Sequence, residues 1–257
     1  MRKFKILFLA LFFSFLNGQN LNYIVYETDD PALYMFGVQE HLVFDEESAY
    51  YFTFFNGETT TWDKDWAFAD LKGILKNQKI TASPLKFDYT QGFTFQKKYF
   101  SEKNKISLVL SHEEILSHNW VIQEEFKEIL GFKVQKASLQ FRGRSWEVWF
   151  APDLPFSEGP WKLKGLPGLV LEARDKNFHI KAVGIHLNLE EEFPENLAQV
   201  FDEEKYTVMP FREVIVGETR FLENSYSAAL ANMPEGGVPI PKENIREDQL
   251  EVEFEWE

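Results

Sequence analysis

The feature that most constrains the fold of this chain is a series of short, aromatic-rich segments that come in pairs joined by brief polar turns. Segments 41–44 and 49–55 flank the acidic turn Asp45-Glu46-Glu47, and segments 131–141 and 144–150 flank Gly143. Strands joined by so few residues must be antiparallel, since a parallel connection needs about a dozen residues or more. The pattern therefore predicts an antiparallel sheet and argues against alternating strands and helices.

Further strands and two helices complete the predicted domain. Strands are predicted at 23–26, 92–100, 106–112, 120–123, 169–173 and 178–189. A loose helical spacing predicts one helix over 63–76, and apolar residues close to multiples of 3.6 apart predict another over 211–231. The fold class is therefore mainly β or α+β: a curved antiparallel sheet, of incomplete half-barrel form, with one or two packed helices.

Residues 1–18 have the pattern of a secretory signal peptide. Basic residues precede an apolar run of eleven residues from Ile6 to Leu16, and Gly18 offers a small residue for cleavage. The run is too short to cross a bilayer as a helix, which needs roughly 20 residues. We expect export to the periplasm or to the outer-membrane or extracellular side, and a single β-rich domain over 19–257 without a transmembrane segment.

Composition excludes several classes of protein. The chain has no cysteine, so disulfides and thiolate metal sites are excluded. The net charge is −14, which argues against binding to nucleic acid because a phosphate backbone needs a concentrated basic surface. The acidic runs at 45–47, 190–192 and 202–204 lack the alternating ligands and turn glycine of a calcium loop, and they indicate solvated loops.

Aromatic residues are unusually abundant. Phenylalanine occurs 26 times, with five of these residues in 1–18 and the other 21 in the predicted domain. Large side chains of this kind fill the core of a sheet protein, or they line a wide interior. The sequence leaves both a phenylalanine-rich core and a cavity for an apolar ligand open.

Familiar catalytic motifs are absent. His112-Glu113-Glu114 resembles the start of a zinc-protease motif, but position 116 is leucine where the second histidine must stand. His179 and His186 lie seven apart on one predicted strand, an odd spacing that places them on opposite faces. Neither a Gly-x-Ser-x-Gly nucleophile motif nor a glycine-rich phosphate loop occurs. We therefore predict no catalytic residue, metal site or cofactor.

A second constraint on the backbone is the glycine- and proline-rich segment 159–170, Gly-Pro-Trp-Lys-Leu-Lys-Gly-Leu-Pro-Gly-Leu-Val. It leads into the predicted strand 169–173 and contains neither a nucleophile nor a general base. Pro167 stiffens the approach. Gly165 and Gly168 are expected to adopt conformations, or to make close contacts, that a Cβ would obstruct.

The strand 144–150 before this segment has apolar side chains on both faces, which predicts a central or covered strand. Arg142 and Arg144 stand at its start. They are candidates either for ion pairs with Glu147, Asp153 or Glu158, or for binding a carboxylate or phosphate headgroup at a pocket mouth. The candidate ligand-binding or motif residues are Arg142, Arg144, Trp146, Trp149, Trp161, Gly165, Pro167 and Gly168.

On these residues the chain resembles the GLPGLI family of exported proteins from Bacteroidetes, named for the segment that here reads Gly-Leu-Pro-Gly-Leu-Val at 165–170. The resemblance covers 42 residues, from Ile129 through the Arg-Gly-Arg bend at 142–144 to Val170. Val134 stands where many members have cysteine. The resemblance implies a β-rich periplasmic or surface protein and no established activity.

Three classes of function remain open on the sequence. The leading one is an exported, non-enzymatic protein that binds an apolar small molecule or an envelope protein on its curved aromatic sheet. A hydrolase that uses two carboxylates is the second, since any of the 41 acidic residues can converge in a fold. A structural component of an envelope assembly is the third.

Overall fold

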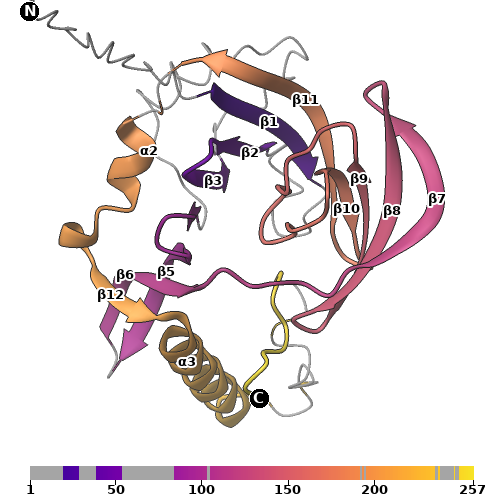
Figure 1. Ribbon diagram of the computed structural model, residues 1–257. Coiled ribbons are helices and arrows are strands. Elements are labelled where there is room, and N and C mark those ends of the chain that lie inside the picture. Colours follow the sequence, from indigo (N-terminus) through magenta and orange to yellow (C-terminus); the bar gives the residue numbers. More distant parts are fainter. Residues whose placement is uncertain are drawn as a thin grey trace, which may run out of the picture.

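The computed structural model describes residues 20–28, 39–53, 84–102, 105–191, 193, 195–234, 237, 246 and 249–257. These residues form one open, strongly curved sheet of twelve strands (Figure 1). The predicted mainly β class with a curved sheet and packed helices is confirmed. The predicted signal peptide 1–18 and the predicted helix 63–76 lie outside the described residues.

The strands are β1 (Asn20–Thr28), β2 (Gln39–Phe44), β3 (Ser48–Thr53), β4 (Leu85–Asp88), β5 (Phe93–Glu102), β6 (Lys105–Glu114), β7 (Val121–Ile129), β8 (Phe132–Phe141), β9 (Arg144–Ala151), β10 (Leu169–Arg174), β11 (His179–Glu190) and β12 (Thr207–Pro210). The helices are α2 (Glu195–Val200), the short 3-10 helix η2 (Glu203–Lys205) and α3 (Phe211–Ala231).

Two series of hairpins meet at β1 in the middle of the sheet. The strand order is β12-β6-β5-β4-β3-β2-β1-β11-β10-β9-β8-β7, so β2 to β6 lie on one side of β1 and β11 to β7 on the other. Described neighbours pair antiparallel, apart from β12, which runs parallel to β6. The edges of the sheet are therefore β12 and β7.

In two of the hairpins, the turn consists of a large residue followed by glycine. Leu130 and Gly131 join β7 to β8 with φ of 51° and 80°, and Arg142 and Gly143 join β8 to β9 with φ of 47° and 77°. Positive φ at both central residues is typical of the tight turn whose twist matches that of the strands. A non-glycine residue costs about 1–2 kcal/mol in this region, so Leu130 and Arg142 must be held there by other contacts.

The connection between β9 and β10, which we call the motif loop (residues 152–168), fills the concave face of the sheet. Leu154, Trp161, Leu163 and Leu166 are buried in one cluster with side chains of β1 to β4 and β8 to β11. Part of the aromatic content therefore forms a packed core on this face, where the chain covers its own sheet.

A smaller core lies on the opposite face, under α2. Leu197 of α2 packs with Tyr23, Tyr50 and Phe52 of the sheet. The buried His41 ring lies in this layer, stacked between Tyr23 and Phe52 at centroid distances of 5.9 Å and 5.5 Å. The two faces of the sheet are thus each covered by a segment that returns from elsewhere in the chain.

The connection from β6 to β7, which we call the strap (residues 115–120), runs from one side of the curved sheet to its far edge (Figure 1). His118 Nε2 and Trp120 Nε1 hydrogen-bond to the carbonyl oxygens of Lys162 and Lys164, at 2.8 Å and 3.0 Å. The motif loop therefore lies between the sheet and the strap.

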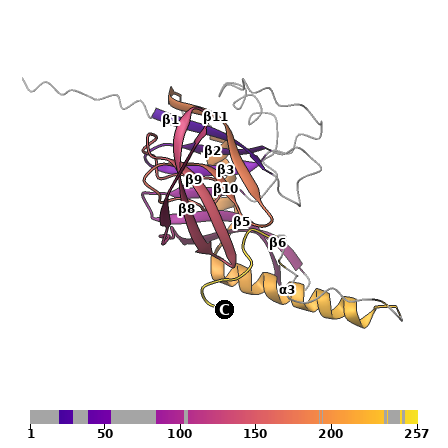
Figure 2. The ribbon, with the colours of Figure 1, turned by 90° about the vertical axis from the view of Figure 1, so that its right-hand side faces the viewer.

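Helix α3 begins at Phe211, directly after Pro210, and its first two turns pack on β5, β6 and β12. Gly217 permits this approach, since a Cβ there would lie 2.4 Å from the ring of Phe100. The rest of α3 projects past the sheet (Figure 2). Its bounds agree with the helix predicted from apolar spacing.

Candidate functional site

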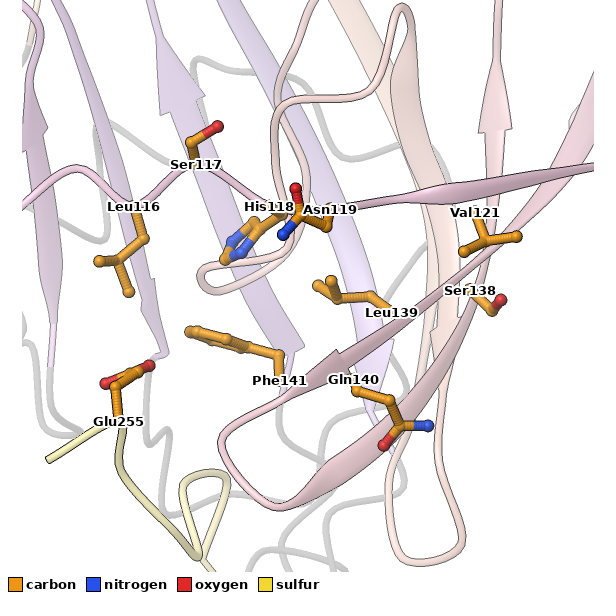
Figure 3. A pocket seen from close by; sticks show the side chains of 10 residues that line it. All are labelled: Leu116, Ser117, His118, Asn119, Val121, Ser138, Leu139, Gln140, Phe141 and Glu255. Carbon is orange, nitrogen blue, oxygen red and sulfur yellow. The ribbon is translucent and has the colours of Figure 1, made fainter. Parts of the chain in front are cut away.

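A pocket of about 510 Å³ lies where the strap passes the start of β7, the end of β8 and the C-terminal tail (Figure 3). Its size falls within the range of about 300–1,000 Å³ that small-molecule sites occupy. The lining residues are Leu116, Ser117, His118, Asn119, Val121, Ser138, Leu139, Gln140, Phe141 and Glu255. The pocket thus combines apolar side chains with amide, hydroxyl, imidazole and carboxylate groups.

The strap offers the pocket three neighbouring polar groups. In the described part of the chain, the side chains of Ser117 and Asn119 have no hydrogen-bond partner, and both residues are exposed. Ser138 and Gln140 differ, because they already bond to Gln123 and Ser145. The polar groups ready to receive a ligand are therefore those of the strap.

His118 has a defined tautomer and a low pKa. Its Nε2 must carry the proton, because the group it meets is the carbonyl oxygen of Lys162, which can only accept. In the neutral ring Nδ1 is then an acceptor. Burial against Phe141, whose ring lies 4.6 Å away, lowers the pKa of His118, and the hydrogen bond to Lys162 only partly opposes this. His118 is therefore neutral near pH 7.

Behind the pocket lies a buried cluster of charges centred on Arg142. Its guanidinium meets Glu113 Oε2 at 2.6 Å and Glu255 Oε1 at 3.1 Å, and it also pairs with Glu251. Lys162 Nζ lies 2.6 Å from Glu113 and 2.7 Å from Glu251. The Arg142 side chain is only 1% exposed, so these carboxylates are what allow its charge to be buried.

The electrostatics of this cluster keep Glu251 ionised. Burial alone would raise the pKa of Glu251, but the charges of Lys162 and Arg142 outweigh it and lower that pKa to about 2. Burial alone would lower the pKa of Arg142, but the negative charges of Glu251 and Glu113 outweigh this effect and raise that pKa. Glu251 is therefore a fixed negative charge and not a proton donor at neutral pH.

A second buried ion pair lies deeper in the motif loop. Lys164 Nζ contacts both carboxylate oxygens of Glu158 at 3.1 Å and the hydroxyl oxygen of Tyr89 at 2.6 Å. Burial lowers the pKa of Lys164, although the charge of Glu158 opposes this shift. A void of about 10 Å³, lined among others by Lys162, Lys164 and His118, separates the two groups and has room for one water.

The predicted arginines lie beside the pocket, with ion-pair partners that the sequence did not suggest. Arg142 pairs with Glu113 and with the C-terminal tail, whereas Glu147, Asp153 and Glu158 were the expected partners. Arg144 meets Asp175 Oδ2 at 2.6 Å and the backbone carbonyl of Leu250 at 3.2 Å. Both guanidiniums tie the tail to the β8–β9 turn.

The three predicted tryptophans are buried against other parts of the chain, and none of them lines the pocket. Trp146 and Trp161 are buried 5.9 Å apart between the sheet and the motif loop. Trp149 is on the other face of β9, where Lys127 Nζ lies 4.3 Å from its ring. That these tryptophans contact a ligand stays a prediction. The contacts observed for them are with other residues of the chain.

The predicted glycines allow the backbone of the motif loop to take a course that a side chain would prevent. Gly165 has a φ of 94°, and a Cβ on Gly168 would lie 2.3 Å from the carbonyl oxygen of Ala151. The expectation that a side chain would be obstructed at these positions is confirmed. Pro167 lies exposed between them.

Sequence reasoning missed most of the pocket. No motif in the sequence pointed to His118, Asn119, Gln140 or Glu255. In the described residues no group of three His, Cys, Asp or Glu side chains could hold a metal ion. No helix among them is long and apolar enough to span a membrane.

Comparison with known proteins gives one family and one fold. No curated protein matches the chain. A solved structure described as "Structure of PNGF-II in C2 space group" superposes with a TM-score of 0.52 at 15% identity, over 76% of this chain and 32% of that one. A second, "Structure of PNGF-II in P21 space group", gives 0.49 at 15% identity over 74% and 31%. This chain thus spans about a third of the length of those structures.

The family comparison covers the strands and loops that build the pocket. The family model described as "N-glycanase peptide, N-terminal domain" matches residues 76–208. This range contains β4 to β11, the strap and the motif loop. With just over half of its residues matched by that model, the chain belongs to the family of N-glycanase peptide, N-terminal domains.

Proposed function

We propose that this protein is a non-catalytic binding module that holds the carbohydrate of a glycoprotein in the pocket under the strap. The observation that carries the proposal is a set of polar groups at the pocket that have no hydrogen-bond partner among the described residues: Ser117, Asn119 and the Nδ1 acceptor of His118, beside the exposed Glu255. Sugar hydroxyls both donate and accept hydrogen bonds, so they match this mixture. Membership of an N-glycanase family supports a glycan as the ligand.

The charges around the pocket favour an uncharged glycan. Glu255 brings a carboxylate to the pocket wall, and the chain as a whole carries a net charge of −14. An acidic sugar would meet like charge there, whereas a neutral sugar would not. The ligand we propose is therefore a neutral N-linked oligosaccharide, presented by an exported glycoprotein if the expected signal peptide directs this chain across a membrane.

The ionised state of Glu251 favours binding over hydrolysis. Glycoside-type hydrolysis needs one carboxyl group whose pKa is raised so that it can donate a proton. At Glu251 the pKa is lowered, to about 2, and Glu113 and Glu251 are both engaged by Lys162 and Arg142. The concave face of the sheet is filled by the motif loop, which also removes room for an apolar ligand there.

The test is a binding measurement with a glycoprotein that carries neutral N-linked glycans and with the same protein after enzymatic deglycosylation. We expect the glycosylated form to bind and the deglycosylated form not to. Asn119→Ala should weaken binding about fivefold, the effect of one hydrogen bond. Gln199→Ala, on the exposed face of α2, is the matched control and should not change it.

Two results would contradict the proposal. Equal binding of both forms of the glycoprotein would exclude the glycan as the ligand. Release of free oligosaccharide by the wild-type protein, lost in Glu251→Gln, would support the hydrolase alternative instead.

A further inference from the structure

The two edges of the sheet are built differently. The edge strand β12 has four residues and ends in Pro210, which has no N–H to offer a further strand. The opposite edge strand, β7, has nine residues and no proline. Short length and proline are ways in which sheet proteins prevent pairing with other chains, and β7 uses neither.

Apolar side chains are exposed along β7. Val121 is 62% exposed, Ile122 47% and Phe126 49%. In the described part of the chain no strand lies on the free side of β7, which forms the right-hand margin of Figure 1. Alternate N–H and C=O groups of an edge strand point away from the sheet, so this edge can accept a further strand. The register with β8 shifts between Ile122 and Phe126, which divides the edge into two short stretches.

The charge on β7 restricts what can pair with it. Glu124 and Glu128 are exposed, and neither has an ion pair in the described part of the chain. Glu125 differs, since it lies 3.3 Å from Lys136. Lys133, which is opposite Glu128 across the hairpin, instead lies over the ring of Phe126 at 4.3 Å. Two uncompensated carboxylates therefore flank an exposed aromatic ring.

A second copy of the same strand fits this edge poorly. Two β7 strands paired antiparallel would bring their glutamates toward one another, and like charges on neighbouring strands are destabilising. An extended segment with lysine or arginine on either side of apolar residues would instead neutralise Glu124 and Glu128 and cover Phe126. Both the backbone and the charge requirements of the edge are met by such a segment.

From this geometry we propose that β7 is a docking edge for a basic, extended polypeptide segment, which adds to the sheet as a thirteenth strand. The site is distinct from the carbohydrate pocket, although Val121 belongs to both. The polypeptide of a glycoprotein would thus pass directly beside the pocket. The edge does not need a sugar to bind its partner, so the two proposals stand or fall separately.

The test uses a fluorescein-labelled nonapeptide, Lys-Thr-Val-Thr-Lys-Thr-Val-Thr-Lys, which places lysine and valine alternately on one face, and two analogues. One analogue has glutamate in place of each lysine, and the other carries N-methyl groups on alternate backbone amides. We expect the lysine peptide to bind about tenfold more tightly than either analogue, because one lacks the charge match and the other the backbone hydrogen bonds. Amide hydrogens of β7 should exchange more slowly with the lysine peptide bound.

Charge reversal supplies the decisive variant. Glu124→Lys with Glu128→Lys should invert the preference, so that the glutamate peptide binds more tightly. Glu190→Lys with Glu204→Lys, at exposed positions on other elements, is the matched control and should retain the preference for lysine. Because all four positions are exposed, the variants should fold, and circular dichroism checks this.

Three results would overturn the proposal. The first is equal binding of the three peptides, and the second is an unchanged preference in the β7 variant. The third is a concentration-dependent dimer in sedimentation that slows exchange at β7 without peptide, which would assign the edge to a second copy of the chain.

Discussion

At the scale of single residues, Arg142 combines an unfavourable backbone with a buried charge. It has a φ of 47° in a turn where asparagine or glycine is preferred, and its guanidinium joins carboxylates from β6 and the tail. Such a residue persists only where its side-chain contacts outweigh the strain. The ion-pair cluster thus holds the turn in place and also builds the wall of the pocket.

Exchange of Arg142 for asparagine separates these two effects. Asparagine suits the backbone of the turn, but among the described residues it leaves Lys162 as the remaining ion-pair partner of Glu251 and Glu113. We expect Arg142→Asn to lower the free energy of unfolding by about 3 kcal/mol, the cost of breaking a buried pair. Leu130→Asn is the matched control, because Leu130 occupies the same type of turn but carries no charge that could form an ion pair. We expect this exchange to raise the free energy of unfolding by up to about 1 kcal/mol. Urea denaturation measures both, and a stabilised Arg142→Asn would contradict the account.

His41 gives a residue-scale prediction about pH. Complete burial lowers its pKa to about 3, well below the value of about 6.5 in an unfolded chain. Between these values the unfolded state binds a proton that the folded state does not, so stability falls as the pH drops from about 6.5 to 3. The loss is on the order of 4 kcal/mol.

Denaturation midpoints measured across this pH range check the His41 prediction. The variant His41→Gln cannot titrate and should show a correspondingly flatter pH dependence. Glu251 contributes a separate loss at lower pH, from about 4.5 down to 2, since its folded pKa is lowered to about 2. An identical slope above pH 5 in wild type and His41→Gln would show that His41 does not contribute.

At the scale of elements, the contact between α3 and the sheet depends on Gly217. A Cβ there would lie 2.4 Å from the Phe100 ring, so Gly217→Ala should push the helix away and destabilise the protein by about 1–3 kcal/mol. Replacement of the ring in Gly217→Ala/Phe100→Leu should recover part of this loss. Thermal unfolding of Gly217→Ala, Phe100→Leu and the double variant measures this recovery, and additive losses in the double variant would show that the two residues are not in contact.

The long elements could be predicted from sequence because their patterns are local. Helix 211–231 shows apolar spacing over five turns, and the predicted bend at Gly143 joins strands of ten and eight residues. The strand predicted at 120–123 was too short, since β7 continues to Ile129, and Gly131, predicted as the start of a strand, lies in the turn to β8. The strands β4 and β12 have four residues each, which is too short for a periodic pattern to emerge. Helix α2 was missed for the same reason, with six residues.

The pocket could not be predicted because its parts come from distant segments. Arg142 and Glu251 are 109 positions apart, and His118 meets a carbonyl 44 positions away. No spacing rule links such residues before the topology of the sheet is known. The motif loop was found because its glycines are constrained locally, but its role as the filling of the concave face depends on the curvature of twelve strands.

At the scale of the whole molecule, the described residues form one curved sheet, and the chain spans about a third of the length of the solved PNGF-II structures it resembles. The family model matched over residues 76–208 shows its family membership, the structural similarity shows its fold alone, and the resemblance to GLPGLI proteins stays a prediction from residues 129–170. The pocket and the β7 edge lie at the same end of the sheet, one suited to a sugar and the other to a polypeptide. This arrangement suits a module that holds both parts of a glycoprotein.

The most direct test of the central claim is chemical-shift mapping of the labelled protein with a free, neutral N-linked oligosaccharide. The account predicts saturable shifts confined to residues 115–121, 138–141 and 255, and their loss in Asn119→Ala. Shifts confined to other surfaces, or no shifts at millimolar oligosaccharide, would contradict a carbohydrate site under the strap.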